Sequence, residues 1–296
     1  MASLKEVKNR INSVQSTRKI TSAMKLVASS KLHKAQASIE SMLPYERQLN
    51  RMMSRFVSEM QGEVSSSFVE QRKVNKAVVI PISSNSSLCG AFNANVIKEV
   101  GRVVEQLRSE GVSIEILPIG SKVADKVKSM GFSFDSNHAS LLDKPSYADA
   151  AQLAATLMQR YAEKEIDRVV LIYNHFKNTA TQVLTVDDFL PISLNSVSTS
   201  ESVNGKIVAD YIVEPSREEI VSQLIPKVLY LKVYTAILDS LASEHAARVV
   251  AMQVATDNAD ELLNDLTLMY NKTRQAAITS ELLDIVGASF VEALFL

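Results

Sequence analysis

The stretch from Lys227 to Val286 reads KVLYLKVYTAILDSLASEHAARVVAMQVATDNADELLNDLTLMYNKTRQAAITSELLDIV and contains neither glycine nor proline. Because these two residues are the usual helix breakers, about 60 uninterrupted residues at about 1.5 Å each predict a helix of about 90 Å. Helices of globular proteins usually run about 8–20 residues, so this length favours a coiled coil.

The opposite end of the chain has the same character, since no glycine or proline occurs from Met1 to Leu43. In both segments apolar residues recur in steps of three and four, the spacing of a heptad seam. In the first segment the seam positions are Leu4, Val7, Ile11, Val14, Arg18, Thr21, Lys25, Ala28, Leu32, Ala35, Ile39 and Met42. In the last segment they are Leu231, Tyr234, Leu238, Leu241, His245, Arg248, Met252, Ala255, Ala259, Leu262, Leu266, Met269, Thr273, Ala276, Ser280 and Leu283. We therefore predict a long antiparallel coiled coil of the N- and C-terminal helices.

Three adjacent seam positions of the N-terminal segment, Arg18, Thr21 and Lys25, are polar. Polar residues weaken a seam between two helices. We therefore expect this part of the helix to contact something other than one apolar helix.

Between the two ends, short apolar runs alternate with amphipathic segments, which is the pattern of an α/β sheet domain. Strands are expected near residues 77–82, 113–119, 168–173, 181–186 and 208–213. Helices are expected near residues 93–108, 122–130 and 147–164, and an exposed loop at 195–205. The fold class is α/β, with a central Rossmann-like domain attached to the coiled coil. The predicted domains are an N-terminal coiled-coil helix over 1–60, a central α/β domain over 74–215 and a C-terminal coiled-coil helix over 216–296.

The composition argues against several classes of protein. There is no run of about 18 consecutive apolar residues, and the first ten residues are too charged for a secretory signal, so membrane association is expected only through partners. A single cysteine, Cys89, and four scattered histidines predict neither a disulfide framework nor a metal site, and favour the reducing cytoplasm. Residues 1–40 carry eight Lys or Arg and two Glu, whereas nine Asp or Glu face five Lys or Arg from Lys227 onward. The two ends therefore have opposite charge.

Several residues could carry chemistry, and each has a structural alternative. The turn Ser83–Asn93 joins a strand to a helix, where phosphates often bind, but it lacks the glycines and the lysine of nucleotide-binding loops. Cys89 could be a nucleophile, but no histidine has a motif context that pairs it with a thiol. His245 and Arg248 lie on the C-terminal seam, where they could simply set the register. A guanidinium there needs a carboxylate or carbonyl partner.

The basic residues between Lys5 and Lys34 could indicate nucleic-acid binding, but no aromatic residues are interleaved with them, and the whole chain has a net charge of −1. A solvated face is the structural alternative, and an acidic protein partner is the functional one. From the residues alone, a nucleotide-dependent enzyme with a coiled arm and a scaffold whose coil spaces two partners both stay open.

Four blocks of sequence carry a resemblance to a known family. They are STRKITSAMKLVA at 16–28, LCGAFN at 88–93, SEHAARVVAM at 243–252 followed by ATDNA at 255–259, and the segment 270–288 with YN, RQA, ITSE and DIVGA. Together they span the chain from end to end in the order of that family. The sequence resembles the γ-subunit family of F-type rotary ATP synthases, in its bacterial form.

This resemblance implies a non-catalytic rotor that couples proton translocation to ATP synthesis. The paired terminal helices would form an asymmetric shaft inside a hexamer of α and β subunits, and the α/β domain would contact the ε subunit and the membrane-embedded c-ring. Catalysis would stay on β, and no cofactor or nucleic acid would be bound. The chain would lie peripherally at the cytoplasmic face of the bacterial inner membrane, held there through the complex.

Individual residues are assigned by the same motifs. The positions that match family contacts with the β subunit are Met24, Arg248, Gln275, Thr279 and Glu281. Tyr211 and Glu214 resemble the foot that faces the c-ring and ε. The chain departs from the family at Asn85-Ser86-Ser87, where relatives commonly have Asp-x-Gly or Asp-Arg-Gly, and at Gly287-Ala288, where many relatives have a pair of small residues before Ala.

Overall fold

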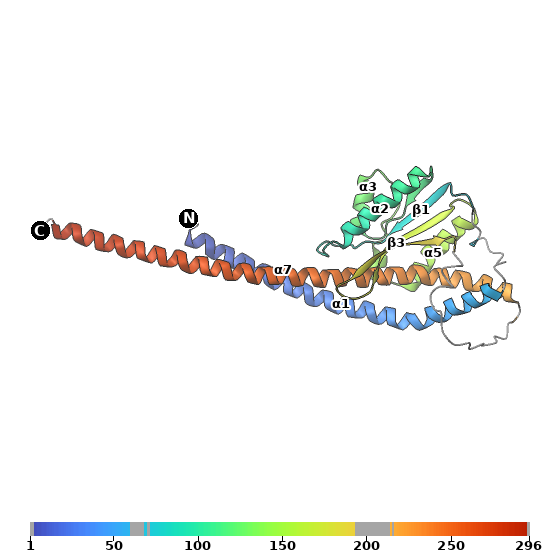
Figure 1. The fold of residues 1–296 in the computed structure, drawn as a ribbon, viewed down its shortest axis with the longest axis horizontal. Helices are drawn as coiled ribbons and strands as arrows, with labels where there is room; N and C mark the ends of the chain where they lie inside the picture. Colours follow the sequence, from blue (N-terminus) through green and yellow to red (C-terminus); the bar gives the residue numbers. More distant parts are fainter. Residues whose placement is uncertain (1–2, 60–67, 70–71, 193–213, 215, 295–296) are drawn as a thin grey trace. The chain divides into compact units, whose positions relative to one another are not determined.

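The computed structural model describes residues 3–59, 68–69, 72–192, 214 and 216–294. The chain divides into two compact units. One, the terminal unit, comprises Met1–Val27 with Val249–Leu296, and the other, the sheet unit, comprises Ala28–Arg248. Two long helices, α1 (Leu4–Glu59) and α7 (Arg217–Leu294), contribute to both units (Figure 1).

The sheet unit is built on a four-stranded sheet with the strand order β2-β1-β3-β4. Its strands are β1 (Lys76–Pro81), β2 (Ser113–Ile116), β3 (Arg168–Phe176) and β4 (Gln182–Leu190). Its shorter helices are α2 (Phe92–Ser109), α3 (Ser121–Ser129), α4 (Ser140–Asp143) and α5 (Tyr147–Ala162). The central strand β1 pairs parallel with β2 and β3, and β4 closes the edge antiparallel to β3.

Each face of the sheet is covered by its own set of helices because successive strand residues point to opposite sides. Ala77 and Val79 pack with α2 and α3, whereas Val78 and Ile80 pack with α5, α1 and α7. Figure 1 shows α2 and α3 on one side of the sheet and the two long helices on the other. A sheet buried on both faces explains why its strands read as continuous apolar runs.

The predicted order of strands and helices from 77 to 190 is confirmed. The strand predicted over 113–119 ends at Ile116, with a single further bridge between Ile82 and Ile119. The short helix α4 was not predicted, because four residues are too few to show a period. The strand expected at 208–213 and the loop expected at 195–205 lie outside the described residues. The division into domains 1–60, 74–215 and 216–296 stays a prediction.

Both long helices continue through a proline, α1 through Pro44 and α7 through Pro226. Within the sheet unit they pack on each other through small residues, where Leu32 contacts Ala242 and Ala246. Alanines let two helix backbones approach closely. Part of α7, Glu219–Leu283, is long and apolar enough to cross a membrane by length and composition, and half of its most apolar window is buried inside the protein.

In the terminal unit, the polar part of the α1 seam faces polar residues of α7. Arg18 forms an ion pair with Asp260 at 2.5 Å, the hydroxyls of Thr21 and Thr256 are 2.8 Å apart, and Lys25 donates to Gln253 at 2.5 Å. The rising numbers on α1 and the falling numbers on α7 establish antiparallel pairing. The polar seam positions of α1 therefore face matching polar groups of α7, and not an apolar helix face.

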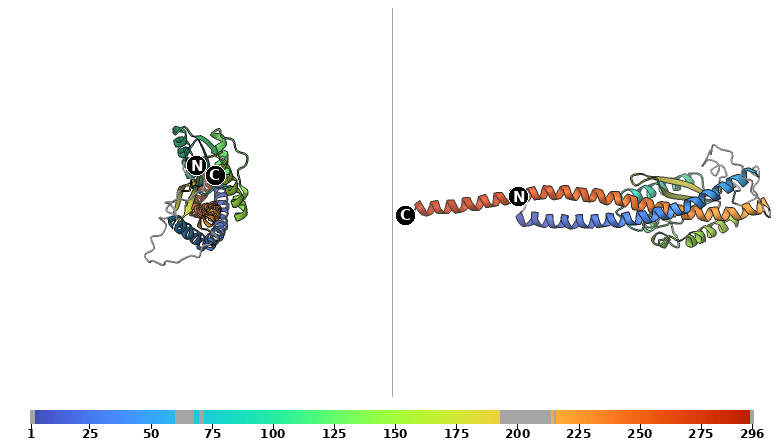
Figure 2. Two further views of the ribbon diagram at one scale, coloured as in Figure 1. Left: turned by 90° about the vertical axis from the view of Figure 1, so that its right-hand side faces the viewer. Right: turned by 90° about the horizontal axis from the view of Figure 1, so that it is seen from below.

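The pairing ends where α1 begins. Val7 and Leu266 are still buried, whereas the later seam positions Met269 and Leu283 are exposed. Figure 2 shows α7 continuing past the first turn of α1. The exposed apolar side chains of α7 from Met269 to Val286 therefore have no described helix to bury them.

His245 lies on the α7 seam within the sheet unit and is mostly buried. Burial, assisted by the charges of Lys31 and Arg248, lowers the pKa of its imidazole from 6.5 to about 4. Among the described residues, its Nδ1 atom has no hydrogen-bond partner. The imidazole is therefore neutral at physiological pH.

We predict that His245→Gln makes the folded chain less sensitive to acid. The unfolded imidazole takes up a proton below about pH 6.5, whereas the folded one does so only near pH 4. The contribution of His245 to the free energy of unfolding is therefore fully present above pH 6.5 and is lost as the pH falls toward 4. Between pH 7 and pH 5 the loss is about 2 kcal/mol, which the glutamine avoids. Urea unfolding at both pH values measures the difference.

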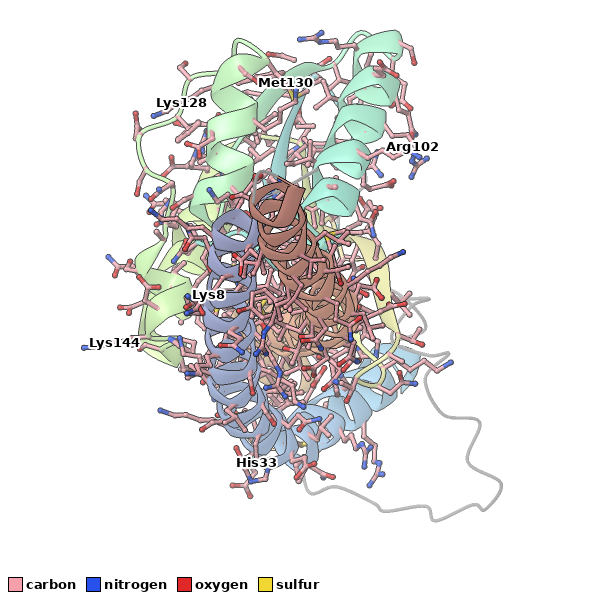
Figure 3. All side chains as sticks on the ribbon, turned by 90° about the vertical axis from the view of Figure 1, so that its left-hand side faces the viewer. Lys8, His33, Arg102, Lys128, Met130 and Lys144 are labelled. Atoms are coloured by element: carbon pink, nitrogen blue, oxygen red, sulfur yellow. The ribbon has the colours of Figure 1, made fainter. Side chains whose placement is uncertain are left out.

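The control is His33→Gln, an exposed imidazole on α1 that Figure 3 shows projecting away from the helices. It should leave the loss of stability between pH 7 and pH 5 as it is in the unmodified chain. An unchanged loss in His245→Gln would contradict the burial argument.

Candidate functional site

Arg248 joins helix α7 to the turn between β1 and α2. Its guanidinium donates to the carbonyl oxygen of Ser87 at 2.5 Å and to the hydroxyl of Ser86 at 2.8 Å, and it pairs with the carboxylate of Glu244 one helical turn earlier. The prediction that this guanidinium needs a carboxylate or a carbonyl is confirmed, because it has both. Burial raises the pKa of the Glu244 carboxyl, while Arg248 and Lys31 oppose that rise.

The turn Ser83–Asn93 is held by its own polar groups. The backbone amide of Ser84 donates to the side-chain oxygen of Asn93 at 3.1 Å, and the amide of Ser83 donates to the carbonyl of Ile119 at 2.9 Å. Asn85 ties the turn to α4, because its side-chain nitrogen donates to Ala139 and Asp143, each at 2.9 Å. These bonds favour the structural interpretation of the turn over nucleotide binding, since two of the amides that would meet a phosphate are already used.

Cys89 lies inside this turn and is buried. Its sulfur accepts a hydrogen bond from the side-chain nitrogen of Asn93 at 3.2 Å. The residues on either side of Cys89 both have positive φ angles, 66° at Leu88 and 58° at Gly90, and they turn the chain into α2. This environment favours the interpretation of Cys89 as a buried small residue that packs the turn over that of an exposed nucleophile.

The terminal unit carries most of the exposed apolar surface. Fourteen of the nineteen large apolar side chains that the described residues leave exposed belong to it, although it holds about a quarter of the chain. On α1 they are Ile20, Met24, Leu26 and Val27. On α7 they are Val250, Val254, Leu262, Leu268, Met269, Ile278, Leu282, Leu283, Ile285 and Val286. A surface of this kind marks a site of protein–protein contact.

The predicted contact residues of the terminal unit lie on this surface. Met24 is 41% exposed on α1, and Gln275, Thr279 and Glu281 are exposed on α7. The hydroxyl of Thr279 donates to the carbonyl of Gln275 at 2.9 Å, within the helix. In the part of the chain that the structure describes, the side chains of Gln275 and Glu281 form no hydrogen bond. Both are therefore available to another chain.

The remaining predicted residues are placed differently. Arg248 belongs to the sheet unit, where three of its five N–H donors bind Ser86, Ser87 and Glu244. Glu214 is exposed, and Tyr211 lies outside the described residues. Glu244, the carboxylate partner of Arg248, was not predicted from the sequence. The spacing of four residues between them, on one face of a helix, is the signal that could have revealed it.

Charge in the terminal unit is divided between its two helices. Residues 1–27 carry six Lys or Arg and one Glu, whereas residues 249–296 carry seven Asp or Glu and two Lys or Arg. Part of this charge is paired between the helices, as in the ion pair of Arg18 with Asp260. Lys8, labelled in Figure 3, is exposed on α1 together with Lys5 and Lys19. The α1 surface is therefore suited to an acidic partner.

Comparison with known proteins shows similarity along nearly the whole chain. The sequence model of the family described as ATP synthase matches residues 3–294. The ATP synthase gamma chain of Phocaeicola vulgatus is 54% identical over 290 residues, covering 98% of this chain and 99% of its own. That of Bacteroides fragilis is 56% identical with the same coverage, and that of Flavobacterium johnsoniae is 45% identical over 289 residues, covering 98% of both chains.

Chains in two solved ATP synthase structures have a similar fold. A chain in the central stalk and c-ring structure of the Tetrahymena thermophila mitochondrial ATP synthase is 27% identical, with a TM-score of 0.58 over 80% of this chain and 99% of that chain. A chain of the Euglena gracilis mitochondrial ATP synthase, 20% identical, shares the fold with a TM-score of 0.64 over 97% of this chain and 94% of that one. On the family match and the identity to these relatives, the chain belongs to the ATP synthase gamma chain family.

Proposed function

We propose that this chain is the non-catalytic central-stalk subunit of an F-type ATP synthase and couples proton translocation through a c-ring to ATP synthesis on β subunits. The observation that carries the proposal is the exposed apolar surface of the terminal unit. Burying one large apolar side chain stabilises a contact by about 1.5–3 kcal/mol, so fourteen of them supply ample free energy for a partner. A surrounding hexamer of α and β subunits would cover such a surface from several sides.

The coupling mechanism follows from the difference between the two paired helices. One helix is basic and the other acidic, and α7 alone continues past the start of α1, so the terminal unit presents different groups in different directions. Three identical β subunits around it would each meet a different face. Each catalytic site would then have a different conformational free energy, and rotation would exchange these states among the sites.

Specific residues have roles in this proposal. Met24 on α1, with Gln275, Thr279 and Glu281 on α7, would contact β, because all four are exposed in the terminal unit. The basic surface of α1 would meet acidic loops of β. Arg248 would act at the β contact while holding the turn at Ser86 and Ser87.

The segment at Glu214 would face the membrane side of the complex. Tyr211 and Glu214 are the proposed foot, which would contact the c-ring and the ε subunit. The chain would lie at the cytoplasmic face of a bacterial inner membrane, as a peripheral part of the complex. Catalytic activity would reside on β, and this chain would need no cofactor of its own.

The alternative of a nucleotide-dependent enzyme has less support. The amides of Ser83 and Ser84, at the turn where a phosphate would bind, already have partners in the chain. Within the described residues, no group of three His, Cys, Asp or Glu side chains is placed to hold a metal ion. A scaffold that only spaces two partners would bind subunits without changing their activity.

We predict that co-expression of this chain with the α and β subunits of the same organism yields a stable complex that hydrolyses ATP. The chain alone should neither hydrolyse ATP nor bind it at micromolar concentration. Turnover and equilibrium dialysis with labelled ATP measure both. ATP hydrolysis by the purified chain would support the enzyme alternative. Equal ATPase activity of the complex with and without this chain would support the scaffold alternative.

We also predict that Gln275→Ala lowers ATP turnover by about fivefold and Arg248→Ala by about tenfold, with assembly retained. These factors correspond to the loss of one neutral and one charge-assisted hydrogen bond. Turnover per assembled complex and the amount of co-purified β subunit measure the two effects separately. The matched control is Gln152→Ala, an exposed glutamine on α5, which should change neither quantity. Equal turnover in all three variants would remove the coupling role of these residues.

A further inference from the structure

A cavity of about 620 Å³ lies in the sheet unit, between α1, α7 and the edge of the sheet formed by β3 and β4. Its volume is within the range of about 300–1,000 Å³ that is typical of small-molecule sites. None of the described residues assigned to the β subunit or to the foot lines it. The proposed function therefore does not explain it.

The cavity has an apolar wall from three elements. Leu43 on α1, Phe189 on β4 and Leu229 on α7 are among the side chains that form it. α1 bends along its second half (Figures 1 and 2), where Pro44 cannot donate the helical hydrogen bond to the carbonyl of Glu40. Between α1, α7 and this edge of the sheet, the described side chains leave the cavity unfilled.

The charged groups that line the cavity are mostly acidic. Lys232 is already used, since its ammonium lies 3.0 Å from the carboxylate of Asp187 and donates to the carbonyl of Asp188 at 2.9 Å. Asp239 lies 2.7 Å from the Nδ1 atom of His175. The carboxylate of Glu46 forms no hydrogen bond or ion pair with any residue in the described part of the chain. An unpaired, half-buried carboxylate is thus directed at an apolar space.

The pKa values of groups that line the cavity are raised, in part by neighbouring carboxylates. Burial raises the pKa of Glu46, and Asp239 raises it further against the weaker effects of Arg47 and His175. The pKa of Asp239 is also raised by burial, although His175 opposes this. Burial raises the pKa of the Tyr173 phenol, and the carboxylates of Asp187, Asp239 and Glu46 add to that rise. Three carboxylates therefore act on one side chain of the cavity, where a cation would be stabilised.

We propose that this cavity binds a small organic amine with an aromatic or aliphatic body, its ammonium group held by Glu46 and Asp239 and its body against Leu43, Phe189 and Leu229. An anion would find Lys232, the one lysine among the described lining residues, already paired. A metal ion would find no group of three His, Cys, Asp or Glu side chains placed to hold it within the described residues. Apolar walls with one unpaired carboxylate match an amphipathic amine in both chemistry and size.

The absence of tryptophan from the chain permits a direct test with tryptamine as the probe, because its indole is then the only indole in the sample. Fluorescence anisotropy of tryptamine is titrated with the purified full-length chain. We expect saturable binding that is at least about tenfold tighter than that of the neutral analogue tryptophol, measured in the same way. This factor corresponds to one charge-assisted hydrogen bond. Equal affinity for the two probes, or no binding of tryptamine, would overturn the proposal.

Two variants and a control locate the site. Glu46→Gln and Asp239→Asn should each weaken tryptamine binding by about tenfold, and should leave tryptophol binding unchanged. Glu46→Gln keeps the shape of a side chain that has no ion pair to lose, so its thermal unfolding should match that of the unmodified chain. Glu105→Gln, an exposed carboxylate on α2, should have no effect. Equal weakening by Glu105→Gln and Glu46→Gln would show general attraction to an acidic surface and would refute the site.

Discussion

The antiparallel pairing of α1 with α7 is the constraint on which the rest of the structure depends. These helices have 56 and 78 residues, so α1 cannot cover the whole apolar face of α7. In the sheet unit the sheet and α5 supply the additional cover, and the shared core includes Leu49, Phe56 and Leu238. In the terminal unit there is no sheet, and the uncovered face is left for another protein.

The composition of the seam differs between the two units. In the sheet unit, Leu32 packs against Ala242 and Ala246, and apolar contact dominates. In the terminal unit, the pairing of Thr21 with Thr256 and of Lys25 with Gln253 replaces apolar contacts by polar ones. Polar pairs stabilise a seam less than leucines do, but they specify one register, because a slipped pairing would leave buried groups without partners. The register then decides which faces of α7 stay exposed.

Much of the fold could be predicted from the sequence because its signals are long. A segment of about 60 residues without a breaker, with apolar residues at heptad spacing, leaves few alternatives to a paired helix. The strands were predictable from runs such as Ala77–Ile82, because a sheet covered on both faces needs apolar residues at every position. The four-residue helix α4 gave no such signal, and neither did the end of β2 at Ile116, which depends on where β1 can still pair.

The sites were less predictable because they combine residues that are distant in sequence. The family motifs pointed to Arg248, but its bonds to Ser86 and Ser87 join positions more than 160 residues apart. The cavity brings Glu46 of α1, Tyr173 of β3 and Asp239 of α7 together, and none of them stands in a recognisable motif. It takes the packed arrangement of three elements to show that the Glu46 carboxylate has no hydrogen-bond or ion-pair partner among the described residues.

The terminal unit also has a consequence for assembly. Its two helices are joined by a seam that is polar in the middle, and helical stability in proteins comes mainly from tertiary packing of an apolar face. Here much of that face is exposed, as at Leu268 and Ile285, so the unit obtains little packing from its own chain. A partner that binds only the folded form stabilises it by mass action. The surface that gives the terminal unit little packing of its own is thus the one that would couple its folding to assembly, whereas the sheet unit has buried cores within the chain.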